Sequence, residues 1–373
     1  MLRDHDLKNI TGPLLGWFAG HARVLPWRED PSPYRVWISE IMLQQTRVEA
    51  VKPYFERFVG ALPDVRALAE CPEDGLLKLW EGLGYYNRAR NLQAAARQIM
   101  EEYGGVMPAD FDALLALPGI GRYTAGAVSS IAFGRPAPAV DGNVLRVLTR
   151  LTEDDTDIMK QAFRREAEEA LAGVLCGLEA CGAFNQALME LGALVCVPNG
   201  DPHCAECPLA DLCAAHAAGR ETEFPVKAKA KARRIEQKTV LVIRDGERFA
   251  LTKRPAKGLL AGMYEFPCAA GRLGEEEALK QAEALGFTPL RIRPLPEAKH
   301  IFSHVEWHMT GWVIRVAAAD GSDGQPGGAA DDIRSDGAIF LATREETERD
   351  FPVPAAYAAY MRELQVKVGP GEG

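Results

Sequence analysis

Hydrophobic periodicity divides the chain into two parts. Up to residue 216, apolar residues recur every three to four positions, as expected for helices that pack on one core. From Lys238 onward, apolar and polar positions alternate, and an Asp-Gly pair between two alternating runs predicts a β-hairpin over 239–252. We therefore expect a multi-domain protein, with an all-α domain over 1–216 and an α+β domain over 238–366.

A basic stretch without apolar periodicity joins the two predicted domains. We expect residues 217–237, which are rich in Lys and Arg, to be an interdomain linker. This stretch could lie along a phosphate backbone or be a solvated tether, and the sequence does not separate the two. Residues 319–331 are predicted to form a mobile loop rich in Gly and Asp, and residues 367–373 a disordered tail.

Composition and charge limit the possible functions. With 373 residues, of which 47% are hydrophobic and 25% charged, the chain has the make-up of a soluble globular protein. We find no apolar run of membrane-spanning length and no signal peptide, so we expect a cytoplasmic location if the chain is bacterial. A net charge of −9 argues against broad electrostatic coating of nucleic acid, so any DNA binding must rest on local contacts.

The sequence Leu-Pro-Gly-Ile-Gly at 117–121 separates two helical runs. Pro118 and the two glycines predict a tight turn with free backbone N–H groups at the positive end of the second helix. Such a turn can bind a phosphate without reading a base. Asp141 follows twenty residues after Gly121, just before an apolar helix. A carboxylate at that position is either a simple N-cap or a reactive group.

Glu40 stands among apolar residues in a predicted helix over 34–43. Periodicity alone favours its exposure on the one polar face of that helix. Burial would instead raise its pKa toward the range of a general acid near neutral pH. The uncharged cluster that follows, Gln44-Gln45-Thr46, could touch base edges in a groove or could be a plain polar helix junction.

Two aromatic stretches are further candidates for DNA contact. Gly82 and Gly84 expose the backbone ahead of Tyr85, which could wedge into a base stack, although core packing is the more common role of such a residue. Arg88 and Arg90 beside it favour phosphate contact.

Residues 25–33 contain three prolines and are predicted to be extended and stiff. Trp27 and Arg28 in this segment could line a base pocket, or Trp27 could simply pack against the first helix.

Four of the eight cysteines lie close together, namely Cys196, Cys204, Cys207 and Cys213. Their spacing in a loop rich in proline predicts a metal site, with disulfides as the weak alternative in a reducing compartment. Spacing alone does not separate a four-cysteine zinc site from an iron–sulfur cluster. Because the ligands tie a single loop, we expect the site to be structural rather than catalytic.

The Leu-Pro-Gly-x-Gly turn and the later Val-Asp-x-Asn resemble the helix-hairpin-helix DNA glycosylase superfamily. Bifunctional members carry a lysine where this chain has Tyr123, and a phenol cannot form the Schiff base that leads to strand cleavage. The second domain resembles a Nudix fold around 259–267, but the paired acids that hold magnesium are missing from its helix, so pyrophosphate hydrolysis is not expected. Together with Gln44-Gln45-Thr46 and Gly82–Tyr86, these features resemble adenine DNA glycosylases of the MutY type.

This resemblance implies a fold, a reaction and a set of functional residues. The fold is an all-α helix-hairpin-helix domain with a 4Fe–4S cluster loop, followed by an α+β Nudix-like domain. The reaction is monofunctional removal of adenine paired with 8-oxoguanine or guanine, in which Glu40 protonates the flipped adenine at N7 and Asp141 stabilises the sugar cation. Tyr123 and Asn143 would orient these two acids.

The remaining residues implied by the resemblance fall into four groups. DNA contacts are Gln45, Thr46, Leu83, Tyr85, Arg88, Gly119 and Gly121; base-pocket residues are Arg28 and Gln186; the 8-oxoguanine reader is Phe302, Ser303 and His304; cluster ligands are Cys196, Cys204, Cys207 and Cys213. The first gap between the cysteines is one residue longer than is usual in the family. The expected partner is double-stranded DNA containing A:8-oxoguanine or A:G mispairs, bound by a monomer.

Two other functions remain open. One is a thymine or uracil mismatch glycosylase of the same superfamily, which the second domain disfavours. The other is a non-catalytic iron–sulfur DNA-binding protein, against which the pair Glu40 and Asp141 argues. A second metal site at His304, Glu306 and His308 is not expected, because strand residues four apart are separated by roughly 13 Å.

Overall fold

The computed structural model describes residues 6–228, 232–318 and 337–366. The chain divides into two compact units, one formed by residues 1–70 with 91–230 and the other by residues 71–90 with 231–373. The loop predicted at 319–331 and the tail predicted at 367–373 lie outside the described residues. Within the described part of the chain, no helix combines the length and the apolar character that crossing a bilayer requires.

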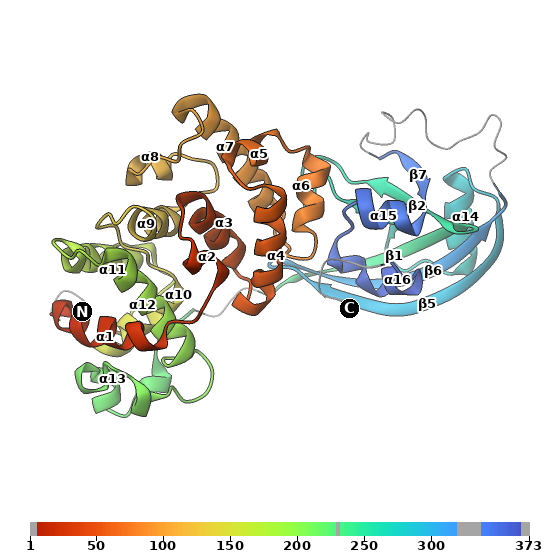
Figure 1. Cartoon of the computed structure of the whole chain (residues 1–373). Helices are drawn as coiled ribbons and strands as arrows, with labels where there is room; N and C mark the ends of the chain where they lie inside the picture. The colour runs from red at the N-terminus through yellow and green to blue at the C-terminus, as the bar shows by residue number, and fades with distance from the viewer. Residues whose placement is uncertain (1–5, 229–231, 319–336, 367–373) are drawn as a thin grey trace. The chain divides into compact units, whose positions relative to one another are not determined.

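The first unit is built of helices, which confirms the predicted all-α architecture (Figure 1). Its helices are α1 (Thr11–His21), α2 (Pro26–Glu29), α3 (Pro33–Leu43), α4 (Val48–Ala61), α5 (Val65–Glu70), α7 (Asn87–Tyr103, which begins in the second unit), α8 (Phe111–Leu115), α9 (Arg122–Ile131), α10 (Gly142–Thr152), α11 (Gln161–Leu175), α12 (Cys181–Leu194) and α13 (Ala214–Ala217).

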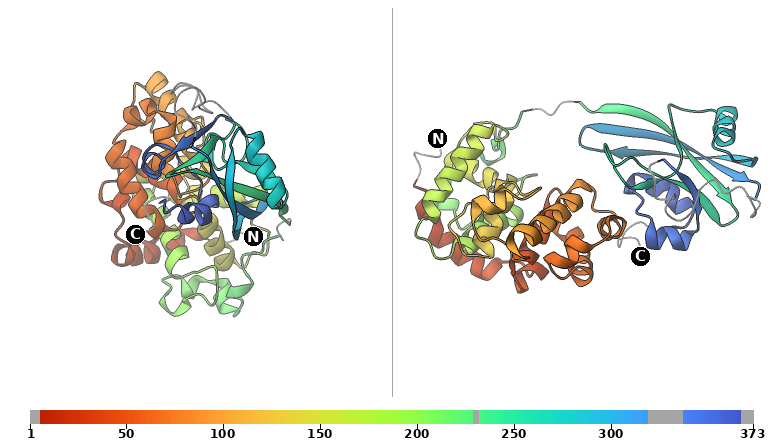
Figure 2. Two further views of the ribbon diagram at one scale, coloured as in Figure 1. Left: turned by 90° about the vertical axis from the view of Figure 1, so that its right-hand side faces the viewer. Right: turned by 90° about the horizontal axis from the view of Figure 1, so that it is seen from above.

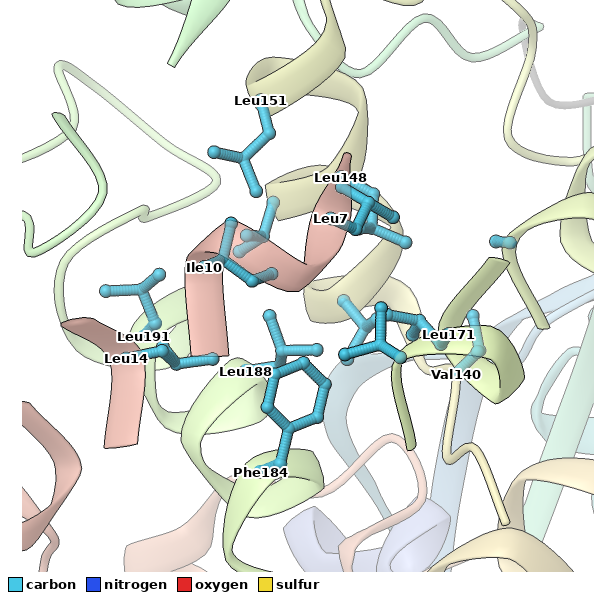
Figure 3. Close-up of a cluster of buried hydrophobic side chains, with 14 of the residues drawn as sticks. Leu7, Ile10, Leu14, Val140, Leu148, Leu151, Leu171, Phe184, Leu188 and Leu191 are labelled. Atoms are coloured by element: carbon cyan, nitrogen blue, oxygen red, sulfur yellow. The ribbon is translucent and has the colours of Figure 1, made fainter. Parts of the chain in front are cut away.

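One apolar core fixes α10 and α12, the helices that carry most of the candidate site. Leu148 of α10 and Leu188 of α12 meet Leu14 of α1 and Leu171 of α11 in this core (Figure 3). All four side chains are fully buried, and burying a leucine contributes about 1.5–3 kcal/mol. The N-terminus of α10, where Asp141 lies, is therefore held by packing along the whole helix.

The turn between α8 and α9 has the predicted helix-hairpin-helix form. Gly119 has φ +74°, and a Cβ atom at this position would lie 2.5 Å from Cβ of Asn91. Both facts require glycine here. Gly121 then takes the N-cap position of α9, with extended backbone.

The prediction that residues 25–33 are extended is wrong in part, because Pro26–Glu29 form the one-turn helix α2. Pro26 occupies the first turn of α2, where its fixed φ and missing N–H favour a helix start rather than an extended chain.

The second unit is built around a seven-stranded mixed sheet, as predicted for an α+β domain. The strand order is β3-β2-β1-β6-β5, with β4 pairing to β1 and β7 to β2. The strands are β1 (Arg234–Asp245), β2 (Arg248–Lys253), β3 (Tyr264–Glu265), β4 (Cys268–Ala270), β5 (Pro289–Ile301), β6 (Val305–Val316) and β7 (Ile339–Ala342).

Helices cover both faces of this sheet (Figure 2). Leu241 and Ile243 of β1 pack against α14 (Glu275–Ala284), while Val240 and Val242 share the opposite core with α16 (Ala358–Glu363). Alternate residues of one strand thus point to two cores. Helix α15 (Arg344–Asp350) also belongs to this unit.

Sequence patterns predicted several elements of this unit correctly and others incompletely. The hairpin over 239–252 is confirmed by the antiparallel pairing of β1 with β2. Strand β5 stops at Ile301, and residues 302–304 form a turn closed by a 2.9 Å hydrogen bond from Phe302 N to Val305 O. Strand β1 begins at Arg234, inside the predicted linker, because its first residues pair in parallel with β6.

One helix of the sequence-predicted helical domain belongs to the second unit. This helix is α6 (Glu73–Trp80), and it lies in the segment 71–90, which carries the Gly82–Tyr86 motif.

Candidate active site

A cavity of about 950 Å³ opens within the first unit. The predicted catalytic acids Glu40 and Asp141 both line it, together with Tyr123, Asn143 and Arg28. These residues come from α2, α3, α9 and α10, so the fold brings together side chains about 100 residues apart in sequence. The cavity falls within the size range of sites that enclose a small ligand or a flipped base.

Glu40 is buried on α3, with 6% of its surface exposed, so the exposure favoured by periodicity is wrong. Periodicity missed this because the polar face of α3 borders the cavity rather than bulk solvent. The hydroxyl of Tyr123 donates a 2.6 Å hydrogen bond to Oε2 of Glu40. Burial raises the pKa of Glu40 to about 7, while the Tyr123 hydrogen bond opposes this rise and the charge of Asp141 adds to it.

Asp141 is the N-cap of α10 and also faces the cavity. Its Oδ1 accepts a 2.8 Å hydrogen bond from the backbone N–H of Val144, and its Oδ2 accepts one of 2.8 Å from Nδ2 of Asn143. Burial raises the pKa of Asp141, and these two hydrogen bonds oppose the rise. The N-cap interpretation is therefore correct and does not compete with a chemical role.

Asn143 is in turn held by a buried arginine. Nη2 of Arg146 donates hydrogen bonds of 2.8 Å to Oδ1 of Asn143 and of 2.6 Å to the carbonyl of Gly192, and its Nε donates to the carbonyl of Cys196 at 2.8 Å. The amide of Asn143 is thus oriented so that its NH₂ group faces Asp141.

A third buried acid, Glu190 of α12, lines the cavity and was not predicted as a site residue. Arg23 and Arg28 both bind it, with N···O distances of 2.8 and 3.0 Å. Burial alone would raise the pKa of Glu190, but the hydrogen bonds from both arginines lower it to about 2. Arg28 also donates a 2.9 Å hydrogen bond to Gln186, so both predicted base-pocket residues meet here. The available signal was the spacing of Gln186 and Glu190 by four residues on an otherwise apolar helix.

Gln45 and Thr46 lie at the margin of the cavity, in the turn after α3. Gln45 has φ +59°, a conformation that non-glycine residues rarely adopt, and such strain is concentrated at functional sites.

The other predicted wedge residues lie in the second unit. Tyr85 is 47% exposed with φ +48°, whereas Leu83 is buried. Arg88 donates hydrogen bonds to the carbonyls of Leu83 and Gly84, at 3.1 and 3.2 Å, and lies over the rings of Trp80 and Tyr85. This inward position favours bracing of the loop over phosphate contact for Arg88.

The predicted reader residues form the tip of the turn between β5 and β6. Phe302 packs on Trp307 and His300, with ring centroids 4.8 and 4.6 Å away. Ser303 and His304 are exposed, with Ser303 Oγ 3.2 Å from Nδ1 of His304. The packed phenylalanine therefore presents two polar, solvent-facing side chains.

The four clustered cysteines occupy one loop of the first unit, and all are free thiols. Burial raises the pKa of Cys204 and of Cys207 to about 11, with a further rise from the charge of Glu221 at Cys204 and from neighbouring cysteines at both. Arg150 of α10 donates a 3.2 Å hydrogen bond to Sγ of Cys196. Four neighbouring thiols with a cationic donor fit a thiolate-bound metal group.

The spacing of the sulfur atoms bears on the type of group. In the described chain, one group of three potential metal-ligand atoms lies within 4.8 Å of one another, and it belongs to Cys204, His216 and Glu221. No three of the four cysteine sulfurs in the described chain are that close together. A single tetrahedral zinc ion, with Zn–S near 2.3 Å, requires sulfurs about 3.8 Å apart.

A second candidate metal site would comprise His304, Glu306 and His308. Glu306 forms ion pairs with Lys299 and His308. Among the described residues, Glu306 and His304 do not belong to a common group of potential metal ligands.

The fold and the cavity define a helix-hairpin-helix base-excision repair protein. Residues 38–172 match the HhH-GPD superfamily base excision DNA repair protein family, and residues 239–363 match the NUDIX domain family. Among solved structures, a thermostable thymine-DNA glycosylase is similar with a TM-score of 0.51 and 31% identity, covering 57% of this chain and 96% of that one.

Known relatives narrow this class. The chain is 35% identical to the adenine DNA glycosylase of Mus musculus, over 86% of this chain and 73% of the relative. It is 34% identical to that of Buchnera aphidicola, over 82% of this chain and 87% of the relative. The chain belongs to the adenine DNA glycosylase family. It is an enzyme that acts on N-glycosyl bonds and removes adenine in base-excision repair.

Proposed function

We propose that this enzyme removes adenine paired with 8-oxoguanine, and also with guanine, by hydrolysis of the N-glycosidic bond. The observation that carries the proposal is the meeting of two carboxyl groups in one cavity, the buried Glu40 and the partly buried Asp141. Their roles in the reaction follow from their different environments.

Glu40 is suited to donate a proton. With a pKa of about 7 it is protonated in a large fraction of molecules at neutral pH, and Tyr123 fixes the position of its Oε2. Transfer of that proton to N7 of adenine lets the bond between the sugar C1′ and the base N9 break, with the electron pair leaving on the base. The carboxylate of Asp141 then stabilises the positive charge on the sugar until water adds to C1′ and releases a proton.

Asp141 is held for this task by Asn143 and by the start of α10. Both hydrogen bonds to Asp141 favour its ionised form. The dipole of α10 also favours negative charge at its N-terminus.

The residues around the cavity support hydrolysis without strand cleavage. The described residues that line the cavity include no lysine, and Tyr123 offers a phenol instead of an amine. A Schiff base with the sugar is therefore not available from this cavity lining.

The clamp of Arg28, Gln186 and Glu190 supports recognition of a purine edge. The ionised carboxylate of Glu190 holds Arg28 in position beside the cavity, and the amide of Gln186 can donate and accept. Such a set rejects a base whose donors and acceptors do not match, because buried polar groups would be left unpaired.

We further propose that Ser303 reads 8-oxoguanine. The hydroxyl of Ser303 is exposed at the tip of a turn that Phe302 anchors, so it is free to meet a base edge. Gln45, Thr46 and Tyr85 are proposed to hold the duplex open, since Gln45 and Tyr85 each adopt a strained backbone conformation.

We propose that Cys196, Cys204, Cys207 and Cys213 hold a 4Fe–4S cluster. In the described chain no three of their sulfurs lie within 4.8 Å of one another, which supports a cluster over a single zinc ion. When bound, the cluster supplies a rigid cross-link of the loop. Iron and sulfide analysis of the purified protein tests this; one equivalent of zinc without iron would contradict it.

Single-turnover excision from four duplexes tests the whole proposal. We expect rapid excision of adenine opposite 8-oxoguanine, slower excision opposite guanine, and none of the pyrimidine from G:T or G:U duplexes. Ser303→Ala should lower the preference for 8-oxoguanine over guanine while excision of A:G persists. Excision from G:T exceeding that from A:8-oxoguanine would overturn the substrate assignment.

A further inference from the structure

Helix α6 carries a polar stripe that the proposed chemistry does not use. Asp74, Lys78 and Glu81 are spaced by four and three residues, so they share one face at the helix and its C-cap. The apolar residues Leu76, Leu77 and Trp80 are fully buried. The stripe belongs to the second unit, as does the whole segment 71–90.

Lys78 and Glu81 bind the backbone next to α15. Nζ of Lys78 donates to the carbonyls of Thr347 and Phe351, at 3.0 and 3.5 Å, at the C-terminus of α15, where the helix dipole favours a cation. Lys78 also pairs with Glu81 at 2.8 Å. Oε1 of Glu81, a residue only 3% exposed, accepts a 2.7 Å hydrogen bond from the backbone N–H of Val353.

The start of α6 is fixed to the β-sheet in the same way. Asp74 accepts a 2.9 Å hydrogen bond from Nζ of Lys253 on β2 and one of 3.2 Å from the hydroxyl of Tyr264 on β3. Arg90, beyond the Gly82–Tyr86 loop, donates to the carbonyl of Ala261. Charged groups therefore attach the segment to the sheet on both sides of the loop.

Glu81 directly precedes the strained part of this loop. Gly82 has φ +100°, Gly84 has φ +69° and Tyr85 has φ +48°. Glycine adopts a positive φ readily, but the conformation of Tyr85 is strained and persists only where the surrounding structure determines it. A buried ion pair adds little net stability because desolvation offsets its attraction, so its value lies in fixing one geometry.

We infer that Lys78 and Glu81 are positioning residues for lesion recognition. They attach the loop that carries Tyr85 to the unit that also carries Ser303. The two proposed contacts to the damaged pair therefore belong to one rigid unit. This inference rests on the proposed function. If this loop loosens, the enzyme loses contacts to the lesion but keeps the chemistry of adenine removal. The selectivity for 8-oxoguanine over guanine should therefore fall before the basal excision rate does.

The test is the ratio of single-turnover rates on A:8-oxoguanine and A:G duplexes, measured with the full-length protein. Lys78→Met and Glu81→Gln should each lower this ratio about tenfold, a size typical of coupling between sites, while the A:G rate stays within twofold. Lys78→Arg should restore the ratio, because a guanidinium can still donate to the same carbonyls. Lys52→Met is the matched control, since Lys52 and Glu49 form an exposed pair with the same three-residue spacing.

The outcomes separate this inference from the proposed function. A wild-type enzyme without preference for 8-oxoguanine would overturn the proposed function itself. A wild-type enzyme with the preference, and variants that keep it, would overturn only the inference. Equal losses on both duplexes would also overturn it, because they indicate a general structural role.

If Lys78→Met does not fold, the rate ratio of Glu81→Gln is the deciding measurement. This variant is expected to fold, since its amide oxygen can still accept the hydrogen bond from the backbone N–H of Val353. Faster hydrogen exchange of the 82–86 amides in Glu81→Gln is expected in support, and unchanged exchange counts against it.

Discussion

Two buried glutamates in the same cavity have opposite proton affinities. Glu40 accepts a hydrogen bond from a neutral phenol and has a pKa of about 7, whereas Glu190 binds two guanidinium groups and has a pKa of about 2. Both are almost fully buried, at 6% and 1% exposure. The comparison shows that the partner, not burial, decides which acid keeps its proton.

This difference assigns separate tasks to the two walls of the cavity. A carboxyl group that is half protonated near neutral pH can deliver a proton to a leaving base. A carboxylate that stays ionised can only accept hydrogen bonds, and those of Glu190 come from Arg23 and Arg28, which it positions beside the cavity. The two arginines thus keep Glu190 ionised as an acceptor. Glu40 on α3 lacks two such arginine partners and therefore remains a proton donor.

The largest expected effect comes from removing the donor. Glu40→Gln should lower the single-turnover excision rate by about 10³-fold, because an amide cannot deliver a proton, while duplex affinity is kept. Rapid-quench kinetics and a binding titration with an A:8-oxoguanine duplex measure the two quantities. Glu56→Gln, an exposed residue on α4, is the control. Turnover of Glu40→Gln within tenfold of the wild type would refute the assignment.

The second-largest effect is expected when Glu190 loses its charge. Glu190→Gln leaves Arg23 and Arg28 without their carboxylate, and breaking a buried ion pair costs about 3 kcal/mol. We expect a lower free energy of unfolding in denaturant titrations, together with weaker adenine excision. Arg66→Met, which breaks the exposed pair with Glu70, should change stability by less than about 0.5 kcal/mol. Equal effects of the two variants would contradict the view that the clamp is structural as well as functional.

Local patterns in the sequence predicted the parts of the fold that local chemistry determines. The Leu-Pro-Gly-Ile-Gly turn and the Asp-Gly hairpin need only backbone preferences of their own residues, and both are present. The first half of β5 is not apparent from the sequence, because Pro294 and Pro296 interrupt the strand pattern. An edge strand tolerates prolines, and β5 lies at the edge of the sheet, with a register shift between Leu295 and Ala298.

Tertiary contacts explain what the sequence could not reveal about the site. Glu190 meets Arg23 across 167 residues, and Glu40 meets Tyr123 across 83. No periodicity marks such pairs. For the same reason the pattern of α6 indicated only an apolar face, and its attachment to the sheet through Lys78 was not foreseen. The family resemblance supplied the roles of Glu40 and Asp141, which patterns alone left open.

The two acids should also give stability opposite dependences on pH. The folded pKa of Glu40 lies above its ordinary value of 4.5, so its stabilising contribution is present below pH 4.5 and is lost as pH rises through about 7. The folded pKa of Glu190 lies below 4.5, so its contribution is present above pH 4.5 and is lost as pH falls toward 2.

Glu40→Gln removes the pH dependence of stability that comes from Glu40, so comparison with the wild type measures that contribution alone. At pH 8 the variant should be more stable than the wild type by about 3 kcal/mol, and at pH 4 the difference should vanish. Denaturant unfolding at both pH values measures this. A variant that is less stable than the wild type at pH 8 would show that Glu40 is not buried as a costly charge.

The smallest expected effect is a shift in the pH profile when Tyr123 loses its hydroxyl. Excision should decline above about pH 7, because Glu40 must be protonated in order to act and deprotonates there. The hydrogen bond from Tyr123 favours the ionised form of Glu40, so Tyr123→Phe should raise the pKa of Glu40 and move the alkaline limb to higher pH. Tyr34→Phe, which removes a buried hydroxyl bonded to the carbonyl of Leu62, should leave the limb in place. A shift to lower pH in Tyr123→Phe would mean that the tyrosine stabilises the neutral acid, which would contradict the direction assigned to its hydrogen bond.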